Sequence, residues 1–540
     1  MKAEVDFDDL LSAAGEFGRY QILLFISTFP FYLFGVFVYF TPPFITEVSD
    51  HWCWIPELEN YTVVARKLLA IPPDENSRFE YSKCRSYVAN WTEVLTTGVK
   101  PNRTWTTETC RHGWEFNNSE IPYPTVTSEM YWVCEKASYS TIALAVFYAG
   151  SVFGGFVMGW ISDKYGRLPA AMLSNIIGCL GGTISAFTRN FVEFAICRFV
   201  LGMASDSCMM LIYLLVLEYV APKYRSLISS LSFALFYAPS VTLLPWIALA
   251  CGHWKIICLV TSIPLGLALF TPLIIPESPR WLLSNGHVED AIEKAVMISR
   301  INRKKIPSTL LEKFRISVSK QKKEDSLSIL DLLRRSVLRN VFIYMCIVFA
   351  TCHLVFDGLV RGIGQLQYDF FISFSIVSST EFPSLLLSAF IMDLAGRKWL
   401  TVLTMIISAI FSVLTVSVGG GIPSVVCAVV ARFAANMGYG TVLQWAAEVL
   451  PTNVRGFGVS IIFTLSEITT LLTPYIIYLE YYAPWLSYAV ISLLAIVCIV
   501  FAILLPETAG KIMPQTFDDA EKMSKIKHED SYGTFMRWPS

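Results

Sequence analysis

Long apolar runs, separated by polar stretches, dominate this chain of 540 residues. Segments of about twenty apolar residues, the length that crosses a bilayer core of about 30 Å, recur along most of it. The pattern predicts an all-α membrane protein with twelve transmembrane helices. They are expected at residues 20–41, 139–161, 168–188, 191–217, 226–249, 254–275, 340–360, 369–391, 399–418, 422–446, 457–479 and 484–505.

Charged motifs recur at a nearly constant offset of 230 to 234 residues. The pairs are Asp163/Asp393, Arg167/Arg397, Arg198/Arg432, Glu218/Glu448, Arg225/Arg455, Pro276/Pro506 and Glu277/Glu507. The chain therefore reads as two parallel six-helix halves, 20–275 and 340–505, with a substrate path between them. A terminal segment 1–19, a connecting loop 276–339 and a tail 506–540 complete the chain, and the first half carries a polar insertion at 42–138.

The repeated charges lie where short loops follow the helices. Gly166 and Gly396 permit sharp turns in these loops. We expect the acids and bases to form salt bridges when the cytoplasmic side closes and to separate when it opens. This gating set contains Asp163, Arg167, Glu218, Arg225, Asp393, Arg397, Glu448 and Arg455. The plainer interpretation, helix capping with a positive-inside bias, does not by itself explain one spacing used twice.

Basic residues in the short loops indicate the orientation of the helices. With the N-terminus inside, the inner loops hold Lys164, Arg167, Lys223, Arg225, Arg397, Lys398 and Arg455, and the outer loops hold Arg189, Lys255 and Arg361. This bias predicts that both termini are cytoplasmic. The insertion 42–138 is then extracellular, and the first helix is an uncleaved anchor because the residues before it are acidic.

The insertion carries the marks of an oxidising, glycosylating compartment. It contains four N-glycosylation sequons and four of the thirteen cysteines. The sequons start at Asn60, Asn90, Asn102 and Asn117, and the cysteines are Cys53, Cys84, Cys110 and Cys134. Four cysteines suggest two disulfides, with three connectivities possible. These features predict a plasma-membrane protein.

Composition narrows the class further. Only 16% of the residues are charged and the mean hydropathy is +0.52, whereas soluble domains carry about 25% charged residues. A net charge of −1 argues against nucleic-acid partners. The sequence contains no zinc-protease motif, no phosphate-binding glycine loop with a lysine and no metal-spaced cysteine set. We therefore expect no enzyme activity, no cofactor and no metal, and a monomer suffices for the predicted fold.

Two local signatures resemble one transporter family. The stretches Gly15–Gln21, before the first helix, and Pro276–Leu282, after the sixth, together with the cysteine-bearing insertion, are similar to the organic cation, carnitine and organic anion transporters, solute carrier family 22 of the major facilitator superfamily. The resemblance covers roughly residues 10–512. It implies transport of small organic ions by alternating access without a bound cofactor.

Acids within the spans indicate the sign of the substrate. Ionisable groups in hydrocarbon cost about 2.5–3.5 kcal/mol each, so they are functional candidates. The candidates are Asp206, Asp357, Glu381 and Glu467. Glu467 and Glu381 match acids of the family's cation branch, and Glu467 stands where the anion and carnitine branches have an arginine. Asp206 departs from that pattern.

Each acid also has a structural interpretation. Glu467 could pair with Arg432, Glu381 could form a buried hydrogen bond near Pro383, and Asp206 could pair with Arg198. If Asp206 is instead functional, it suggests a second positive group on the substrate or a proton-coupling site.

Aromatic side chains supply further candidates for a cation site. Phe349, His353 and Phe356 are spaced to share one helix face beside Asp357. Tyr237, Trp445, Phe31 and Tyr32 are weaker candidates of the same kind, and packing is the alternative for all of them. His353 could carry a proton or be a hydrogen-bonded core residue.

Three functions remain to be distinguished. The leading hypothesis is transport of small organic cations such as biogenic amines, and the surplus of acids would suit carcinine-type substrates with an amine and an imidazole. The nearest alternative is a carnitine, zwitterion or organic anion carrier that uses Arg198 and Arg432. A receptor or sensor on the same fold is the alternative of another class, although it would not need two switching gates.

Overall fold

A computed structural model gives the fold for residues 6–74, 81–97, 102, 104–119, 121–320, 329–366, 368–451, 454–511 and 513–525. Twelve helices in these ranges are long and apolar enough to cross a membrane, which confirms the twelve predicted spans. Parts of the predicted terminal segment, connecting loop and tail, namely 1–5, 321–328 and 526–540, lie outside the described residues.

The spans divide into two sets of six helical units. The first set is α2 (Arg19–Ser27) with α3 (Phe29–Thr46), α7 (Ser138–Tyr165), α8 (Arg167–Ser185), α9 (Phe191–Ser205) with α10 (Ser207–Glu218), η3 (Phe233–Tyr237) with α12 (Ala238–Cys251), and α13 (Trp254–Ser262) with η4 (Ile263–Leu273). The second set is α18 (Ser336–Arg361), α19 (Phe370–Ser379) with α20 (Glu381–Ala395), α21 (Arg397–Ser417), α22 (Ile422–Val449), α23 (Arg455–Thr470) with α24 (Thr473–Tyr478) and η6 (Leu479–Tyr481), and α25 (Leu486–Leu504).

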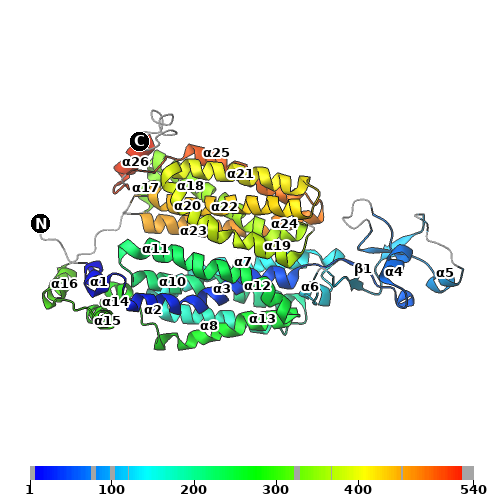
Figure 1. The fold of residues 1–540 in the computed structure, drawn as a ribbon, viewed down its shortest axis with the longest axis horizontal. Helices are drawn as coiled ribbons and strands as arrows, with labels where there is room; N and C mark the ends of the chain where they lie inside the picture. Colours follow the sequence, from blue (N-terminus) through cyan, green and yellow to red (C-terminus); the bar gives the residue numbers. More distant parts are fainter. Residues whose placement is uncertain are drawn as a thin grey trace.

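The two sets form two bundles that lie side by side (Figure 1). In this view the first six spans lie below and the last six above, and we call them the N-half and the C-half. Helices α1 (Phe7–Gly15) and α26 (Phe517–Lys525) lie at the left, which we call the terminal end, and the insertion projects to the right, which we call the lobe end. An even number of spans in each half is consistent with these two helices lying on one side.

Several spans bend where the sequence weakens the helical hydrogen-bond ladder. The fifth span is preceded by α11 (Pro222–Ser232) and enters through the π-helical turn η3, so it is less regular than the single helix predicted at 226–249. The sixth span changes to 3₁₀ geometry at η4, which has Pro264 near its start and Pro272 inside. Proline removes a backbone donor, and such places mark bends in helices.

Small residues let the N-half helices pack closely. A Cβ atom added to Gly150 of α7 would meet the backbone of Phe199 in α9, and one added to Gly202 would meet the backbone of Phe147 in α7. Glycine at these crossings therefore brings the two backbones together, as is common in membrane helix pairs.

The insertion forms a small lobe with two short antiparallel sheets. Strand β1 (His51–Cys53) pairs with β4 (Trp114–Phe116), and β2 (Arg85–Tyr87) pairs with β3 (Thr107–Thr109). Its helices are α4 (Val63–Ala70), α5 (Trp91–Thr97), α6 (Val126–Glu129), η1 (Pro56–Leu58) and η2 (Cys134–Lys136). Hydrogen bonds from Tyr123 Oη to the Phe44 carbonyl (3.0 Å) and from Thr127 Oγ1 to the Glu47 carbonyl (2.8 Å) fasten the lobe to α3 and the segment after it.

Short helices cover the terminal end. The N-half carries α1 (Phe7–Gly15), α14 (Pro279–Ser284), α15 (Val288–Ile301) and α16 (Ser308–Lys320). The C-half carries α17 (Ile329–Arg334) and α26 (Phe517–Lys525), and Arg335 pairs with Asp518 between them. Figure 1 shows the first group below and the second above.

Candidate functional site

The repeated charge motif forms the same local pairs in both halves. Arg167 Nη1 lies 2.6 Å from Asp163 Oδ1, and its Nε lies 3.6 Å from Glu218 Oε1. In the C-half, Arg397 Nη2 lies 2.9 Å from Asp393 Oδ1, and its Nε lies 3.0 Å from Glu448 Oε2. Within the described ranges, no ion pair recorded at the terminal end joins the two halves.

The repeated acids Glu277 and Glu507, for which the sequence suggested no role, cap the N-termini of α8 and α21. The Glu277 carboxylate accepts hydrogen bonds from the backbone N–H groups of Arg167 (3.0 Å) and Leu168 (3.1 Å). Glu507 does the same for Arg397 (2.9 Å) and Lys398 (3.1 Å) at the start of α21. Burial raises the pKa of the Glu277 carboxyl, although the backbone donors and Arg167 oppose the shift. A carboxylate at a helix N-terminus satisfies orphan donors and complements the helix dipole.

Arg225 and Arg455, the other two arginines of the gating set, do not pair with the acids of that set. Arg225 Nη2 lies 3.0 Å from Asp8 Oδ1, and Arg280 also pairs with Asp8. Arg455 Nε donates to the Leu450 carbonyl at 3.2 Å. Asp8 was not predicted, because only the folded chain brings α1 beside Arg225.

Glu381 is neutralised inside the C-half. Its Oε1 lies 2.7 Å from Arg432 Nη2, and the two side chains are 4% and 0% exposed. Arg432 also donates to the Phe356 carbonyl, and its guanidinium carbon lies 3.7 Å from the centre of the Phe356 ring. The alternative pairing of Arg432 with Glu467 is therefore wrong in this conformation.

Asp357 joins the two halves near the lobe end. Arg361 Nε donates to both Asp357 carboxylate oxygens at 3.0 Å, from the same helix. From the N-half, Tyr148 Oη donates to Asp357 Oδ2 at 2.8 Å and Tyr39 Oη to Oδ1 at 3.3 Å. The sequence placed Arg361 in an outer loop, and this was wrong: Arg361 ends α18 and its side chain is 3% exposed.

Further contacts between the halves lie on the same side of the bundle. The ring of Phe44, in α3, packs on those of Phe370, Phe371 and Phe374 in α19. Ser375 Oγ donates to the Thr242 carbonyl at 3.5 Å. Together with Asp357 and its tyrosines, these contacts close the lobe end of the interface.

Of the four predicted acids within the spans, Glu467 and Asp206 have no arginine or lysine partner in the described part of the chain. The Glu467 side chain is 30% exposed, and its Oε1 lies 3.9 Å from His353 Nδ1. Asp206, between α9 and α10, accepts a hydrogen bond from Ser151. The predicted alternative for Asp206 was wrong, because Arg198 instead lies over the Phe194 ring and donates to Cys258 Sγ.

The aromatic stripe of α18 packs with a residue that the sequence did not single out. Tyr439 stacks on Phe356 (4.8 Å between ring centres) and on His353 (5.2 Å), and it also contacts Phe349. His353 Nδ1 lies 2.6 Å from Ser466 Oγ, so this histidine is hydrogen-bonded in the core.

The other aromatic candidates differ in burial. Phe349 and Trp445 are 0% exposed, and the Trp445 indole donates to the Pro506 carbonyl, so both belong to the packed interior of the C-half. Tyr237 lies in the π-helical turn and is partly exposed, whereas Tyr32 is buried against Phe233 and Phe236. Phe31 is partly exposed.

The lobe contains two disulfides. Cys53 is bonded to Cys110 and Cys84 to Cys134, which is one of the three possible connectivities. His51 lies beside Cys84 and Cys134, but the two sulfur atoms are bonded to each other and are not available to a metal. Burial lowers the pKa of the His51 imidazole from its usual 6.5 to about 4.

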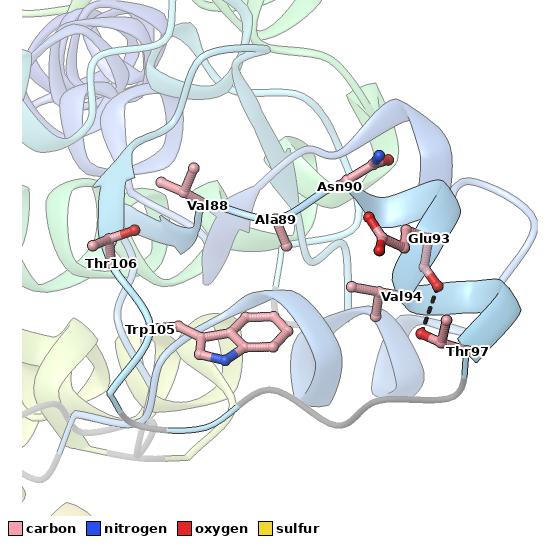
Figure 2. A pocket seen from close by; sticks show the side chains of 8 residues that line it. All are labelled: Val88, Ala89, Asn90, Glu93, Val94, Thr97, Trp105 and Thr106. Atoms are coloured by element: carbon pink, nitrogen blue, oxygen red, sulfur yellow. Dashed lines mark hydrogen bonds between the residues drawn. The ribbon is translucent and has the colours of Figure 1, made fainter.

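A groove of about 400 Å³ in the lobe lies next to one predicted glycosylation site. Its lining includes Asn90, Glu93, Val94 and Trp105 (Figure 2). The Asn90 side chain is exposed. The groove is far along the lobe from the membrane spans, so it does not form part of the acid and aromatic group described above.

Comparison with known proteins gives one family and consistent relatives. Residues 97–517 match the family model described as sugar (and other) transporter. The carcinine transporter of Drosophila melanogaster is 28% identical over 96% of this chain and 80% of its own length. The organic cation/carnitine transporter 2 of Homo sapiens is 26% identical over 97% of this chain and 95% of its own length.

A solved structure shows the same fold. The inward-open xylose transporter XylE from E. coli superimposes with a TM-score of 0.60 and 16% identity, covering 93% of this chain and 99% of that one. At this identity the likeness establishes the fold alone, which is that of a major facilitator transporter.

Proposed function

Because the chain belongs to the sugar (and other) transporter family of the major facilitator superfamily, and is a multi-pass membrane transporter, we propose that it carries small organic cations across the plasma membrane. The observation that carries this proposal is the state of Glu467. Its carboxylate is partly exposed at the interface and has no arginine or lysine partner among the described residues.

The contrast with the other acids supports a cation rather than an anion as substrate. Glu381 and Asp357 are each paired with an arginine, and both arginines are buried. An anionic substrate would need a free cationic side chain at the interface. Arg432 is committed to Glu381, and Arg198 is enclosed between α9 and α13 inside the N-half. A carboxylate left unpaired in a low-dielectric region attracts a positive group.

We assign Asp206 as a second acid of the same site. It lies on the N-half and has no ion-pair partner in the part of the chain that the structure describes. Its hydrogen-bond partner Ser151 belongs to α7, which packs against α23, the helix that carries Glu467. A substrate with an amine and a second basic group would suit two such carboxylates, and the similar Drosophila protein is named a carcinine transporter. His353, Phe356, Tyr237 and Tyr439 supply the surrounding aromatic faces.

Transport is proposed to proceed by alternating access, with the terminal end cytoplasmic and the lobe extracellular. The closed contacts at the lobe end and the pairing of the motif charges within each half support an inward-facing conformation. When the terminal end closes, the two motifs approach each other and their acids and bases gain partners across the interface. The sequons at Asn60, Asn90, Asn102 and Asn117 are proposed glycosylation sites.

Uptake of labelled cations, zwitterions and anions into cells tests this function, with Glu467→Gln and Glu467→Arg compared at equal surface expression. We expect wild type to take up cations, Glu467→Gln to lose at least tenfold and Glu467→Arg to lose cation uptake altogether. Glu193→Gln, at the exposed start of α9, is the matched acid-to-amide control and should transport normally. Anion uptake by wild type with no effect of Glu467→Gln would refute the proposal. Ligand binding without uptake would favour a receptor.

A further inference from the structure

The guanidinium of Arg361 is a buried cation whose outer nitrogens have no hydrogen-bond acceptor. Its Nη1 and Nη2 are both enclosed and unpartnered among the described residues, and only Nε reaches a carboxylate. A buried charge costs free energy unless its surroundings replace water. Aromatic faces replace water here.

Three rings from the N-half surround this guanidinium. The Arg361 guanidinium carbon lies 5.1 Å from the ring centre of Tyr39, 5.2 Å from that of Tyr148 and 6.0 Å from that of Phe40. All three distances are within the range of cation–π attraction. Asp357 supplies the counter-charge, and the hydroxyls of Tyr39 and Tyr148 both donate to it. We call the rings of Tyr39, Phe40 and Tyr148 the arginine cage.

The cage belongs to the N-half, whereas Arg361 belongs to the C-half. The rings belong to α3 and α7, whereas Asp357 and Arg361 lie one turn apart on α18. When the lobe end opens, the rings must leave Arg361. The aromatic faces and their hydroxyls are then accessible to another cation arriving from outside.

The position of the cage puts it on the route to Glu467. His353, which lies 3.9 Å from Glu467, precedes Asp357 by four residues on α18, and Arg361 follows by four more. These three residues therefore rise along one face of the helix toward the lobe end. A cation entering from the lobe end meets the cage about one helical turn before it reaches Glu467.

We propose that the arginine cage is a second cation-binding site, filled by Arg361 in this conformation and by a small organic cation when the lobe end is open. The chemistry of the cage favours guanidinium and methylated ammonium groups, because aromatic faces hold weakly hydrated cations. Only the identity of the natural ligand rests on the proposed function, since the site itself does not depend on Glu467. Arg361 and the ligand compete for one place, so ligand binding there opposes closure of the lobe end.

Chemical rescue tests the site directly in the purified full chain. All proteins carry Glu467→Gln, so that binding at Glu467 does not contribute, and the probe is methylguanidinium. We expect Arg361→Ala to show a saturable rise in its thermal unfolding temperature with the probe. The parent protein, whose cage is filled, and Arg361→Lys, which keeps a cation in the cage, should respond only at much higher probe concentrations because their own cation competes. Addition of Tyr148→Leu to Arg361→Ala should weaken the response at least tenfold. A response equal in all four proteins, or absent from Arg361→Ala, would overturn the proposal.

A second measurement uses the unaltered arginine and so does not depend on the folding of Arg361→Ala. Ser375 is buried against the Thr242 carbonyl while the lobe end is closed. Cells expressing Ser375→Cys are treated with a membrane-impermeant thiol reagent, and the protein without this cysteine gives the background from native thiols. External methylguanidinium should raise the labelling rate saturably, at least threefold, and Tyr148→Leu should abolish the dependence. A labelling rate that methylguanidinium leaves unchanged, or changes equally in Tyr148→Leu, contradicts the site.

Failure of this proposal is distinguishable from failure of the proposed function. If wild type takes up no cation but methylguanidinium still rescues Arg361→Ala, the cage stands and the transport assignment falls. If Glu467→Gln abolishes cation uptake but no rescue occurs, the transport assignment stands and the cage falls.

Discussion

The ion pair between Glu381 and Arg432 gives the sharpest test of how this protein uses its embedded charges. Both side chains are nearly fully buried, and the two charged atoms are 2.7 Å apart. The pair lies wholly within the C-half, between α20 and α22. We therefore expect Glu381 to stabilise the fold rather than to bind substrate.

The expected magnitude follows from what each substitution leaves behind. Arg432→Met leaves the Glu381 carboxylate buried without its partner, and Glu381→Leu leaves the guanidinium in the same state. Breaking a buried pair from one side costs about 3–5 kcal/mol, whereas replacing both partners by apolar residues is often nearly neutral. For a shift of about 2–4 °C per kcal/mol, each single variant should unfold on the order of 10 °C below wild type.

Thermal unfolding of the purified protein in detergent measures the cycle. The double variant Glu381→Leu/Arg432→Met should lie closer to wild type than either single variant, which corresponds to a coupling of at least about 2 kcal/mol. Additive losses in the double variant would refute the reasoning, because they would mean that the two charges do not depend on each other. If Glu381→Leu kept its stability but lost cation uptake, Glu381 would instead be a substrate-binding residue.

Three further predictions concern the helix cap and the lobe. Glu507→Gln should lower the stability of the C-half by about 1.5–3 kcal/mol, because the backbone N–H of Arg397 loses a charged acceptor. A decrease in unfolding temperature smaller than that caused by an exposed Glu-to-Gln substitution would contradict this. The lobe should become less stable as the pH falls from about 6.5 to 4. In this range His51 is protonated in the unfolded lobe, whereas burial lowers its pKa and keeps it neutral in the folded lobe. Limited proteolysis on cells should show this at pH 5, where the effect is about 2 kcal/mol, and His51→Gln should remove the pH dependence. Asn90→Gln should reduce the glycosylated mass on a gel by one chain, and an unchanged mass after this substitution would exclude the site.

The sequence predicted the architecture well because each span is marked by its own local composition. A run such as 486–504 contains no charged residue and only two serines, and no tertiary contact is needed to recognise it. The repeat at 230 residues added the division into halves, and here too the signal lies in the chain itself. Glu277 and Glu507 were visible as a repeated pair, but their role as caps depends on where the chain turns after the sixth and twelfth spans.

The partners of the embedded charges were less predictable. Arg432 and Glu381 are 51 residues apart, and nothing local favoured Glu381 over Glu467 as the partner. Asp357 and Arg361, four residues apart, could have been read as a helical ion pair, but the basic residue was taken for part of a polar loop. Tyr39 and Tyr148 could not have been found from spacing, since they reach Asp357 only across the interface between the halves.

The two ends of the chain can serve as a gauge of the transport cycle. Helix α1 is held to the N-half through Asp8 and Arg225, and helix α26 is held to the C-half through Asp518 and Arg335. Both helices lie at the same end of the molecule (Figure 1). A donor fluorophore attached to one and an acceptor attached to the other would move with opposite rigid bodies, so energy transfer between them would rise each time the terminal end closes. The protein therefore offers a way to watch single turnovers without a label near the substrate path.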